Sequence, residues 1–189
     1  MCIRDRSIEW WLPPIFRRAD ALLILLDLTD DPLAQMETLT AELEKMRIGI
    51  GKAEGEFINR KKALVAGNKL DLADARHNYV KLQDSYGKQL PITAISARDG
   101  TGLEELKFKI YQVLDIIRVY TKAPGQKPDF TEPIVLSRGS TLADAAENVH
   151  KDFRAKLKYA RLWGSGKHDG IMVKRDHILQ DGDVIELHM

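Results

Sequence analysis

The stretch Ala63-Leu64-Val65-Ala66-Gly67-Asn68-Lys69-Leu70-Asp71 decides the fold of this chain. Its first five residues form an apolar run with the length and composition of a short buried strand, and polar residues follow at once. The segment therefore predicts a strand over residues 62–67 in an open α/β sheet. Residues 68–71 would lie at the carboxyl end of that strand, which is the edge where such sheets bind ligands.

Residues 68–71 carry side chains that suit recognition of a guanine base. Guanine presents two adjacent donors, a ring N–H and an exocyclic amine, and the carboxylate of Asp71 can accept from both at once. Asn68 can join neighbouring loops and contact the other edge of the base, while the stem of Lys69 can lie across the ring. The pattern alone leaves a simpler alternative open, because Asn and Asp are also common in turns that follow strands.

A second strand end meets a complementary requirement of the same base. Residues 91–95 predict another short strand, and Ser96-Ala97-Arg98-Asp99-Gly100 follows it at the same edge of the sheet. A tight Ser-Ala turn can direct backbone N–H groups at the guanine carbonyl oxygen, which is an acceptor where adenine has a donor. Two loops that suit one base favour guanine recognition over turn formation alone.

Strand and helix patterns alternate along the first 117 residues. Residues 21–27 are continuous apolar sequence ending in an acid, which is typical of a parallel strand covered on both faces. Helical periodicity follows in residues 32–47, 75–87 and 101–117, whereas residues 49–60 read as a loop. In the second of these helices the residues expected to be buried are Tyr79, Val80, Leu82 and Tyr86. The alternation predicts an α/β fold in which the strands at 21–27, 62–67 and 91–95 are parallel and adjacent.

Composition changes near Arg118, and short strands around one helix follow. Thr141 caps that helix, whose Leu142, Ala145, Val149 and Phe153 are expected on one buried face. The predicted strands are residues 119–121 and 134–136, which form a hairpin, and residues 159–163, 171–173 and 184–187. These elements favour a ubiquitin-like β-grasp domain. We therefore expect one domain over residues 1–116 and a second over residues 117–189.

The two loops resemble known motifs. Asn68-Lys69-Leu70-Asp71 and Ser96-Ala97-Arg98 are similar, in order and separation, to the fourth and fifth motifs of Ras-like GTPases. The resemblance implies that Asn68, Lys69 and Asp71 hold the base and that Ser96 and Ala97 help through the backbone. The family often has lysine where Arg98 stands.

The C-terminal region resembles a TGS domain of the DRG branch of Obg-type GTPases. The resemblance is carried by Val119-Tyr120-Thr121-Lys122, Pro128-Asp129-Phe130, Ser140-Thr141-Leu142-Ala143-Asp144, Leu162-Trp163-Gly164-Ser165 and Asp181-Gly182-Asp183-Val184-Ile185. It implies a partial Ras-like parallel sheet followed by a β-grasp TGS domain. It also implies a GTP-binding protein of the translation apparatus, with GTP or GDP as ligand and Mg²⁺ as the metal of the full-length family. The implied partners are RNA, the ribosome or a regulatory protein.

The 189 residues contain no Gly-x-x-x-x-Gly-Lys-Ser/Thr segment. GTPases of this family bind the nucleotide phosphates in such a loop, through backbone N–H groups at a helix start and a hydroxyl that holds Mg²⁺. The Gly-Lys pairs here precede Ala53, Gln89 and His168 instead. We therefore expect this chain to be the C-terminal part of a longer GTPase and to be inactive in GTP hydrolysis as it stands. The alternative is a nucleotide-independent adaptor that binds RNA or the ribosome.

Charge composition restricts where nucleic acid can bind. Lysine and arginine total 29 against 28 acidic residues, so the formal charge of +1 gives no reason to expect broad polyanion binding. A local patch is required, and the best candidate is formed by Lys151, Arg154, Lys156, Lys158 and Arg161. A solvated helix face is the alternative, because Glu147 and Asp152 interrupt the patch.

Several other functions lack support in the sequence. The single Cys2 excludes an internal disulfide and a cysteine-rich zinc site. Asp27 and Asp30 follow a strand at the ligand edge, but turn and helix-capping roles are favoured over a metal site. No apolar run approaches the roughly 20 residues of a membrane span, and the opening residues are too polar for a secretory signal. We expect a cytoplasmic protein without a membrane partner.

Overall fold

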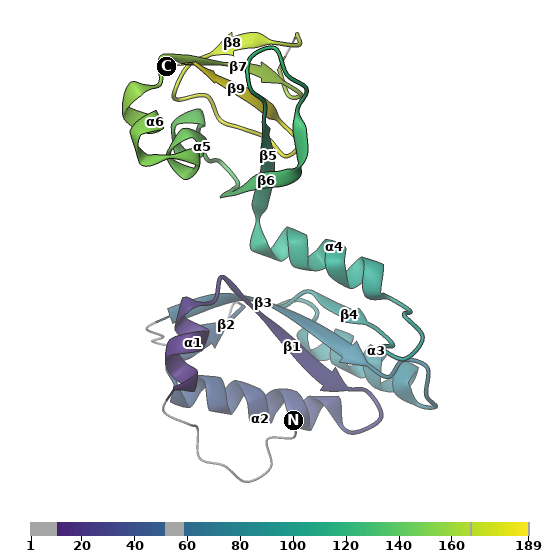
Figure 1. Ribbon diagram of the computed structural model, residues 1–189. Coiled ribbons are helices and arrows are strands. Elements are labelled where there is room, and N and C mark those ends of the chain that lie inside the picture. Colours follow the sequence, from purple (N-terminus) through teal and green to yellow (C-terminus); the bar gives the residue numbers. More distant parts are fainter. Residues whose placement is uncertain (1–10, 52–58, 167, 189) are drawn as a thin grey trace. The chain divides into compact units, whose positions relative to one another are not determined.

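The computed structural model describes residues 11–51, 59–166 and 168–188. The chain divides into two compact units, Met1–Leu114 and Asp115–Met189 (Figure 1). Each unit has its own hydrophobic core, and the two units are described separately below.

The first unit is built around β3 (Asn59–Asn68). β1 (Ala21–Asp27) runs parallel to β3 in a register that joins Ala21 to Lys62 and Asp27 to Asn68. β4 (Ile92–Ala94) also runs parallel to β3, opposite residues 65–67. The prediction that these three strands are parallel and adjacent is confirmed.

A fourth strand, β2 (Ile48–Ile50), was not expected. Its three residues are buried and pair in parallel with residues 59–61 of β3, and its last two residues fall in the region predicted to be a loop. The prediction was wrong at these positions because three residues are too few to show a period in the sequence. Residues 52–58 of the predicted loop lie outside the described residues, and residues 59 and 60 begin β3 instead.

Helices cover both faces of this sheet. α2 (Pro32–Lys45) and α3 (Ala75–Tyr86) pack on one face, and α4 (Leu103–Leu114) packs on the other (Figure 1). α1 (Leu12–Arg18) contributes Phe16 to the cluster on the α2 side. The turn before α2 places Asp31 as its N-cap, where the carboxylate accepts from the N–H groups of Leu33 and Ala34.

Two details of the predicted helices were wrong. Val80 was expected to be buried, yet it is exposed on α3, whereas Leu82 of the same helix is fully buried. The predicted helix over 101–117 ends at Leu114, because Asp115 has a left-handed backbone (φ 56°) that breaks the helix. Ile117 consequently packs in the core of the second unit.

The second unit contains a mixed five-stranded sheet in the order β6-β5-β9-β7-β8. Its strands are β5 (Ile116–Thr121), β6 (Asp129–Ser137), β7 (Tyr159–Trp163), β8 (Ile171–Val173) and β9 (Val184–His188). β5 and β6 form the predicted antiparallel hairpin, and β9 lies parallel to β5 in the centre. The predicted strands and the β-grasp arrangement are confirmed.

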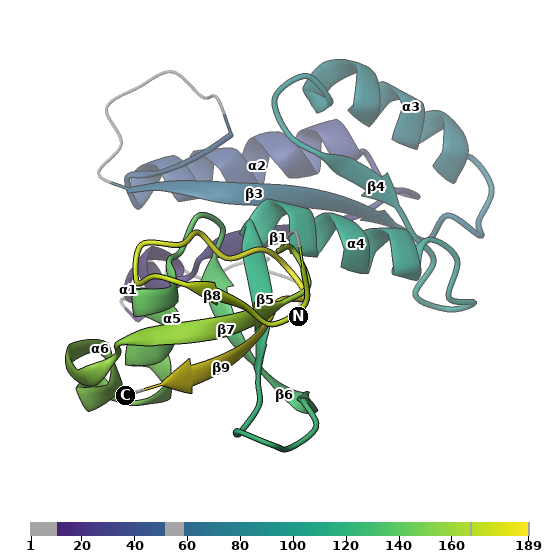
Figure 2. The same ribbon diagram turned by 90° about the horizontal axis from the view of Figure 1, so that it is seen from above.

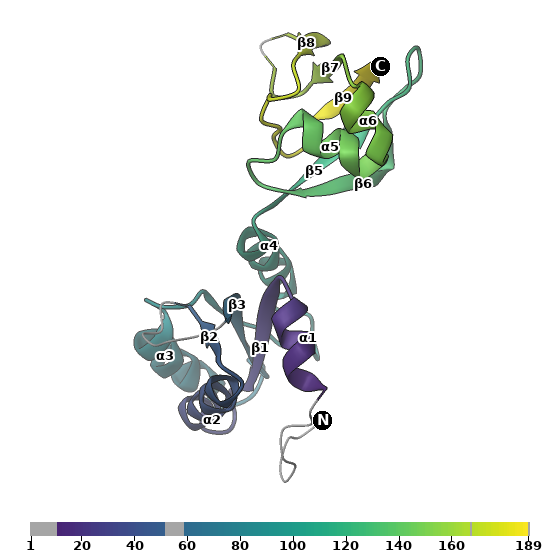
Figure 3. The same cartoon turned by 90° about the vertical axis from the view of Figure 1, so that its left-hand side faces the viewer.

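The helical segment of this unit consists of α5 (Leu142–Val149) and α6 (Lys151–Lys156) (Figure 3). A capping box starts α5: Asp144 N–H donates to the Thr141 hydroxyl oxygen, and the Asp144 carboxylate accepts from Thr141 N–H. The single helix predicted through Phe153 is wrong, since His150 is extended (φ −165°, ψ 139°) and separates the two. Val149 is therefore exposed instead of buried. In the part of the chain that the structure describes, no helix is both long and apolar enough to cross a membrane.

Candidate nucleotide-base site

The loops that follow β3 and β4 lie next to each other at one end of the first sheet (Figure 2). Leu70 N–H donates to the Ile95 carbonyl at 3.0 Å, which joins the two loops directly. Between them is a pocket of about 430 Å³. It is lined by Asn68, Lys69, Asp71, Leu72, Ala97 and Arg98.

Asp71 offers a held carboxylate at this pocket. The Ser96 hydroxyl donates to its Oδ1 at 2.7 Å, and Arg98 Nη1 lies 3.8 Å from its Oδ2. The Arg98 side chain is highly exposed, so this wide ion pair contributes little. A carboxylate offers about four acceptor positions, and Asp71 therefore has capacity for two further donors that enter the pocket.

Asn68 ties the two loops together, as the sequence predicted. Its Oδ1 accepts from Ala97 N–H at 3.0 Å, which leaves the two donors of the Asn68 amide nitrogen for other partners. The N–H of Ala97 is thus held by the protein in this structure, although it was expected to face the base.

Ser96 contacts Asp71 through its side chain, while its backbone N–H, which was expected to help hold the base, donates within its own loop. It is fully buried, and its N–H donates to the Thr101 carbonyl at 2.9 Å. Its hydroxyl donates to Asp71 and lies 3.4 Å from the Asp99 nitrogen, which donates to it. The geometry makes Ser96 a positioning residue for the Asp71 carboxylate.

Lys69 is held by an acid that the sequence analysis did not assign to the site. Its Nζ lies 2.5 Å from Asp27 Oδ2, and its backbone is left-handed with φ 70°. Asp27 also accepts from the N–H and hydroxyl of Thr29, in the turn that was predicted. Asp27 ends β1 at the same edge as Lys69, and that shared edge is the signal that was available in the sequence.

The pair shifts both groups toward their charged forms. Burial acts to raise the pKa of Asp27, but hydrogen bonds from Lys69 and Thr29 outweigh it and hold the pKa below its ordinary value. The hydrogen bond to Asp27 raises the pKa of Lys69. Because the ion pair with Asp27 anchors the charged ammonium group, the aliphatic part of the Lys69 side chain has a fixed direction beside the pocket.

The residues around this site do not form a metal centre. Among the described residues, no group of three or more His, Cys, Asp or Glu side chains is placed to hold a metal ion. The carboxylate of Asp27 is occupied by Lys69 and Thr29, and that of Asp30 accepts from Asp31 N–H.

Four of the five basic residues predicted as a patch lie on or just after α6, whereas Arg161 lies on β7. Lys151, Arg154 and Lys156 lie on α6, and Arg154 forms ion pairs with Glu147 and Asp144. Lys158 follows the helix. Arg161 is exposed on β7, between Ala160 and Leu162, whose side chains are buried in the core beneath α5 and α6. Because side chains alternate along a strand, Arg161 faces away from the helices.

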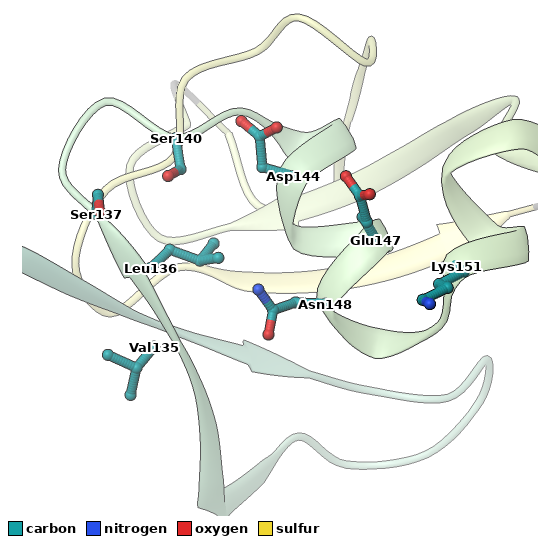
Figure 4. A pocket seen from close by; sticks show the side chains of 8 residues that line it. All are labelled: Val135, Leu136, Ser137, Ser140, Asp144, Glu147, Asn148 and Lys151. Atoms are coloured by element: carbon teal, nitrogen blue, oxygen red, sulfur yellow. The ribbon is translucent and has the colours of Figure 1, made fainter. Parts of the chain in front are cut away.

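A polar pocket of about 590 Å³ lies between β6 and α5 (Figure 4). Lys151 lines it together with Asp144 and Glu147, as the close view shows. The surroundings of Lys151 are therefore of mixed charge, which reduces its attraction for a polyanion.

Comparisons with known proteins place this geometry in context. Residues 117–189 match the family model of the TGS domain. An uncharacterised GTP-binding protein of Methanocaldococcus jannaschii is 43% identical over 128 residues, which are 66% of this chain and 32% of that protein. Developmentally-regulated GTP-binding protein 1 of Xenopus laevis is 42% identical over 95 residues, covering 49% of this chain and 26% of that protein.

Solved structures show a similar fold. A GTP-binding protein from Pyrococcus horikoshii aligns with a TM-score of 0.66 and 16% identity, over 91% of this chain and 79% of that chain. The YchF GTPase of Schizosaccharomyces pombe aligns with a TM-score of 0.68 and 11% identity, over 93% and 74% of the two chains. The chain spans about a third or less of the length of the two curated relatives.

Proposed function

We propose that this chain recognises guanine nucleotides through the pocket between the loops that follow β3 and β4. We also propose that it contacts RNA or the ribosome through its TGS domain, residues 117–189. The chain is a homologue of the developmentally regulated GTP-binding proteins. The observation that carries the proposal is the held carboxylate of Asp71 in a pocket that Asn68, Lys69 and Ala97 also line. We further propose that the protein acts in the cytoplasm, with the translation apparatus.

The pocket residues divide the recognition of the base among them. Asp71 accepts from the ring N–H and exocyclic amine of guanine, the donor pair that adenine lacks. Asn68 donates from its amide to the other edge of the base. Lys69, anchored by Asp27, lies along one face of the ring, and Ser96 keeps the carboxylate turned toward the pocket.

Nucleotide phosphates would have to be bound elsewhere than in these two loops. The 189 residues contain no phosphate-binding Gly-Lys-Ser/Thr loop, and the described residues provide no magnesium ligand set. In the full-length family Mg²⁺ neutralises phosphate charge when it is bound. For this chain the testable activity is base recognition, with affinity for the nucleoside on the order of millimolar because a small ligand with few contacts binds weakly.

The test is a titration of the chain with guanosine, adenosine and xanthosine, followed by the backbone amide signals in nuclear magnetic resonance spectra. Guanosine should shift the signals of Asn68, Leu70 and Ala97, and adenosine should not. Asp71→Asn should lose the response to guanosine and gain one to xanthosine, because xanthine has a carbonyl where guanine has its amine. We expect a loss of about ten-fold to a hundred-fold, since a buried donor left without its charged acceptor costs about 1–3 kcal/mol.

Asp84→Asn is the matched control, since it removes the same charge from an exposed position on α3. It should leave the guanosine response unchanged. Equal shifts with guanosine and adenosine would contradict guanine recognition. Binding of RNA without any guanosine response would instead support the nucleotide-independent adaptor.

A further inference from the structure

The face of the TGS sheet that points away from α5 and α6 carries a layer of rings and cations. Side chains alternate along each strand, so the positions between core residues fall on this second face. On β7 these positions are Tyr159, Arg161 and Trp163, because Ala160 and Leu162 pack into the core. We call this surface the open face and define it by Tyr120, Lys122, Phe130, Tyr159, Arg161 and Trp163.

The strand register brings these side chains together from sequence-distant elements. β9 lies between β5 and β7, with Val184 paired to Tyr120 on one side and to Trp163 on the other. Tyr120 and Trp163 are therefore two strand spacings apart, or about 10 Å. Tyr159 and Trp163 are four residues apart on one strand, or about 13 Å. In the part of the chain that the structure describes, the helices of this unit pack on the opposite face (Figure 3).

The rings are arranged as small platforms. Phe130 meets Tyr120 edge to face with a centroid distance of 5.0 Å, and 61% of Phe130 remains exposed. Tyr159 stacks on His188 at 4.6 Å with an interplanar angle of 11°. Tyr120, Tyr159 and Trp163 are half-buried, and none of these rings belongs to the core, which lies on the other side of the sheet. Ring surfaces that remain partly exposed mark binding sites when they gather on one face.

Cations lie between the rings. Lys122 Nζ is 4.1 Å from the centroid of the Trp163 ring and 3.2 Å from Glu186 Oε2. Glu186 also lies 2.8 Å from His188 Nε2, so this buried acid is already partnered within the face. Arg161 is exposed and forms no ion pair with another described residue. Among the six residues that define the open face, Arg161 therefore carries the exposed positive charge.

We infer that the open face of the TGS sheet binds single-stranded RNA, with bases stacked on Phe130, Tyr159 and Trp163 and a phosphate at Arg161. This inference rests on the RNA partner in the proposed function and specifies its form and location. Every unpaired base has a ring face, and a flat sheet with interleaved rings and cations matches an extended strand of bases and phosphates. In a duplex the bases are stacked on one another and cannot stack on these rings, so a duplex would contact the open face only through its phosphate charges.

The test measures binding of a fluorescent eight-nucleotide RNA to the 189-residue chain by anisotropy, with the RNA either single-stranded or in a duplex. The single strand should bind more tightly than the duplex. Phe130→Leu keeps an apolar side chain but removes the ring, and it should weaken single-strand binding at least about five-fold. Arg161→Gln should weaken it and lower the slope of log affinity against log salt by about 0.7.

Phe108→Leu is the matched control, because Phe108 is 62% exposed but lies on α4 in the other unit. It should bind the single strand as the unchanged chain does. Equal binding of single strand and duplex would overturn the inference, as would a Phe130→Leu variant that binds as Phe108→Leu does. Loss of binding only with Lys156→Ala and Lys158→Ala would also overturn it, while leaving an RNA-binding TGS domain intact.

If neither RNA form binds at millimolar protein, the inference fails together with the RNA part of the proposed function. Guanine recognition is measured separately with nucleosides, and its result does not depend on this outcome.

Discussion

The Ser96 hydroxyl donates to Asp71 Oδ1 at 2.7 Å and thereby links the ends of two strands that are separate in sequence. Both groups are shielded: Ser96 is fully buried and the Asp71 side chain is only 17% exposed. A hydrogen bond to a charged group in such a place contributes to stability and fixes the carboxylate.

Ser96→Ala should therefore destabilise the first unit by about 1–2 kcal/mol and weaken the guanosine response. Urea unfolding, followed by amide signals of β3 and β4, measures the first effect, and nucleoside titration measures the second. Ser85→Ala, at an exposed position on α3, is the control and should change neither. A Ser96→Ala variant with unchanged guanosine affinity would show that Asp71 needs no positioning by the hydroxyl.

Calorimetry with GTP should detect no tight binding to the 189-residue chain, with or without Mg²⁺. The base pocket offers few contacts, and the sequence contains no loop that binds phosphates. We expect a dissociation constant on the order of millimolar and no magnesium dependence. Tight, magnesium-dependent binding would contradict this account of the site.

The ion pair between Asp27 and Lys69 should be visible in an acid titration. The pKa of Asp27 is lowered in the folded protein, so its ionised form stabilises the fold above the ordinary value of 3.8. That stability is lost as the pH falls through the lowered folded pKa. Carboxyl carbon signals should show Asp27 titrating below 3.8, and Lys69→Gln should raise the midpoint. An Asp27 midpoint that does not move in this variant would argue against the pair.

β1 should promote self-association of the chain. It is an edge strand among the described strands of its sheet, and its Leu25 is 58% exposed. An exposed apolar edge offers backbone groups and side chains to a second molecule. Sedimentation should show a mean mass that rises with concentration, and Leu25→Lys should reduce the rise. Val80→Lys, which changes a residue of α3 that is 54% exposed, is the control. A chain that stays monomeric throughout would refute the prediction.

The basic residues near α6 should add electrostatic affinity for a longer RNA, one that extends from the open face to the side of α6. The double variant Lys156→Ala and Lys158→Ala removes two exposed cations, and each phosphate contact releases about 0.7 of a counterion from single-stranded RNA. The slope of log affinity against log salt should fall by about 1.4. Lys45→Ala, on exposed α2 surface of the other unit, is the control. An unchanged slope would mean that these lysines lie on a solvated face that RNA does not contact.

The sequence by itself was sufficient to predict the strands around the base pocket and, apart from β2 and the division between α5 and α6, the order of the elements in both units. A short continuous apolar run such as residues 63–67 is typical of a parallel strand covered by helices, because that arrangement removes both faces of the strand from water. The capping box at Thr141 could also be predicted, because it depends only on residues close together in the chain. The pairing of Asn68 with the Ser-Ala turn followed from the shared sheet edge.

Only the tertiary structure decided features that depend on long-range packing. The short strand β2 forms because β3 offers a partner, and the break at His150 leaves Val149 exposed. The ion pair of Lys69 with Asp27 and the burial of Ser96 against Asp71 depend on how two strand ends meet. The separation of Arg161 from α6 has the same origin. Side chains near one another in sequence go to opposite faces of a strand, and the core determines which face each one takes.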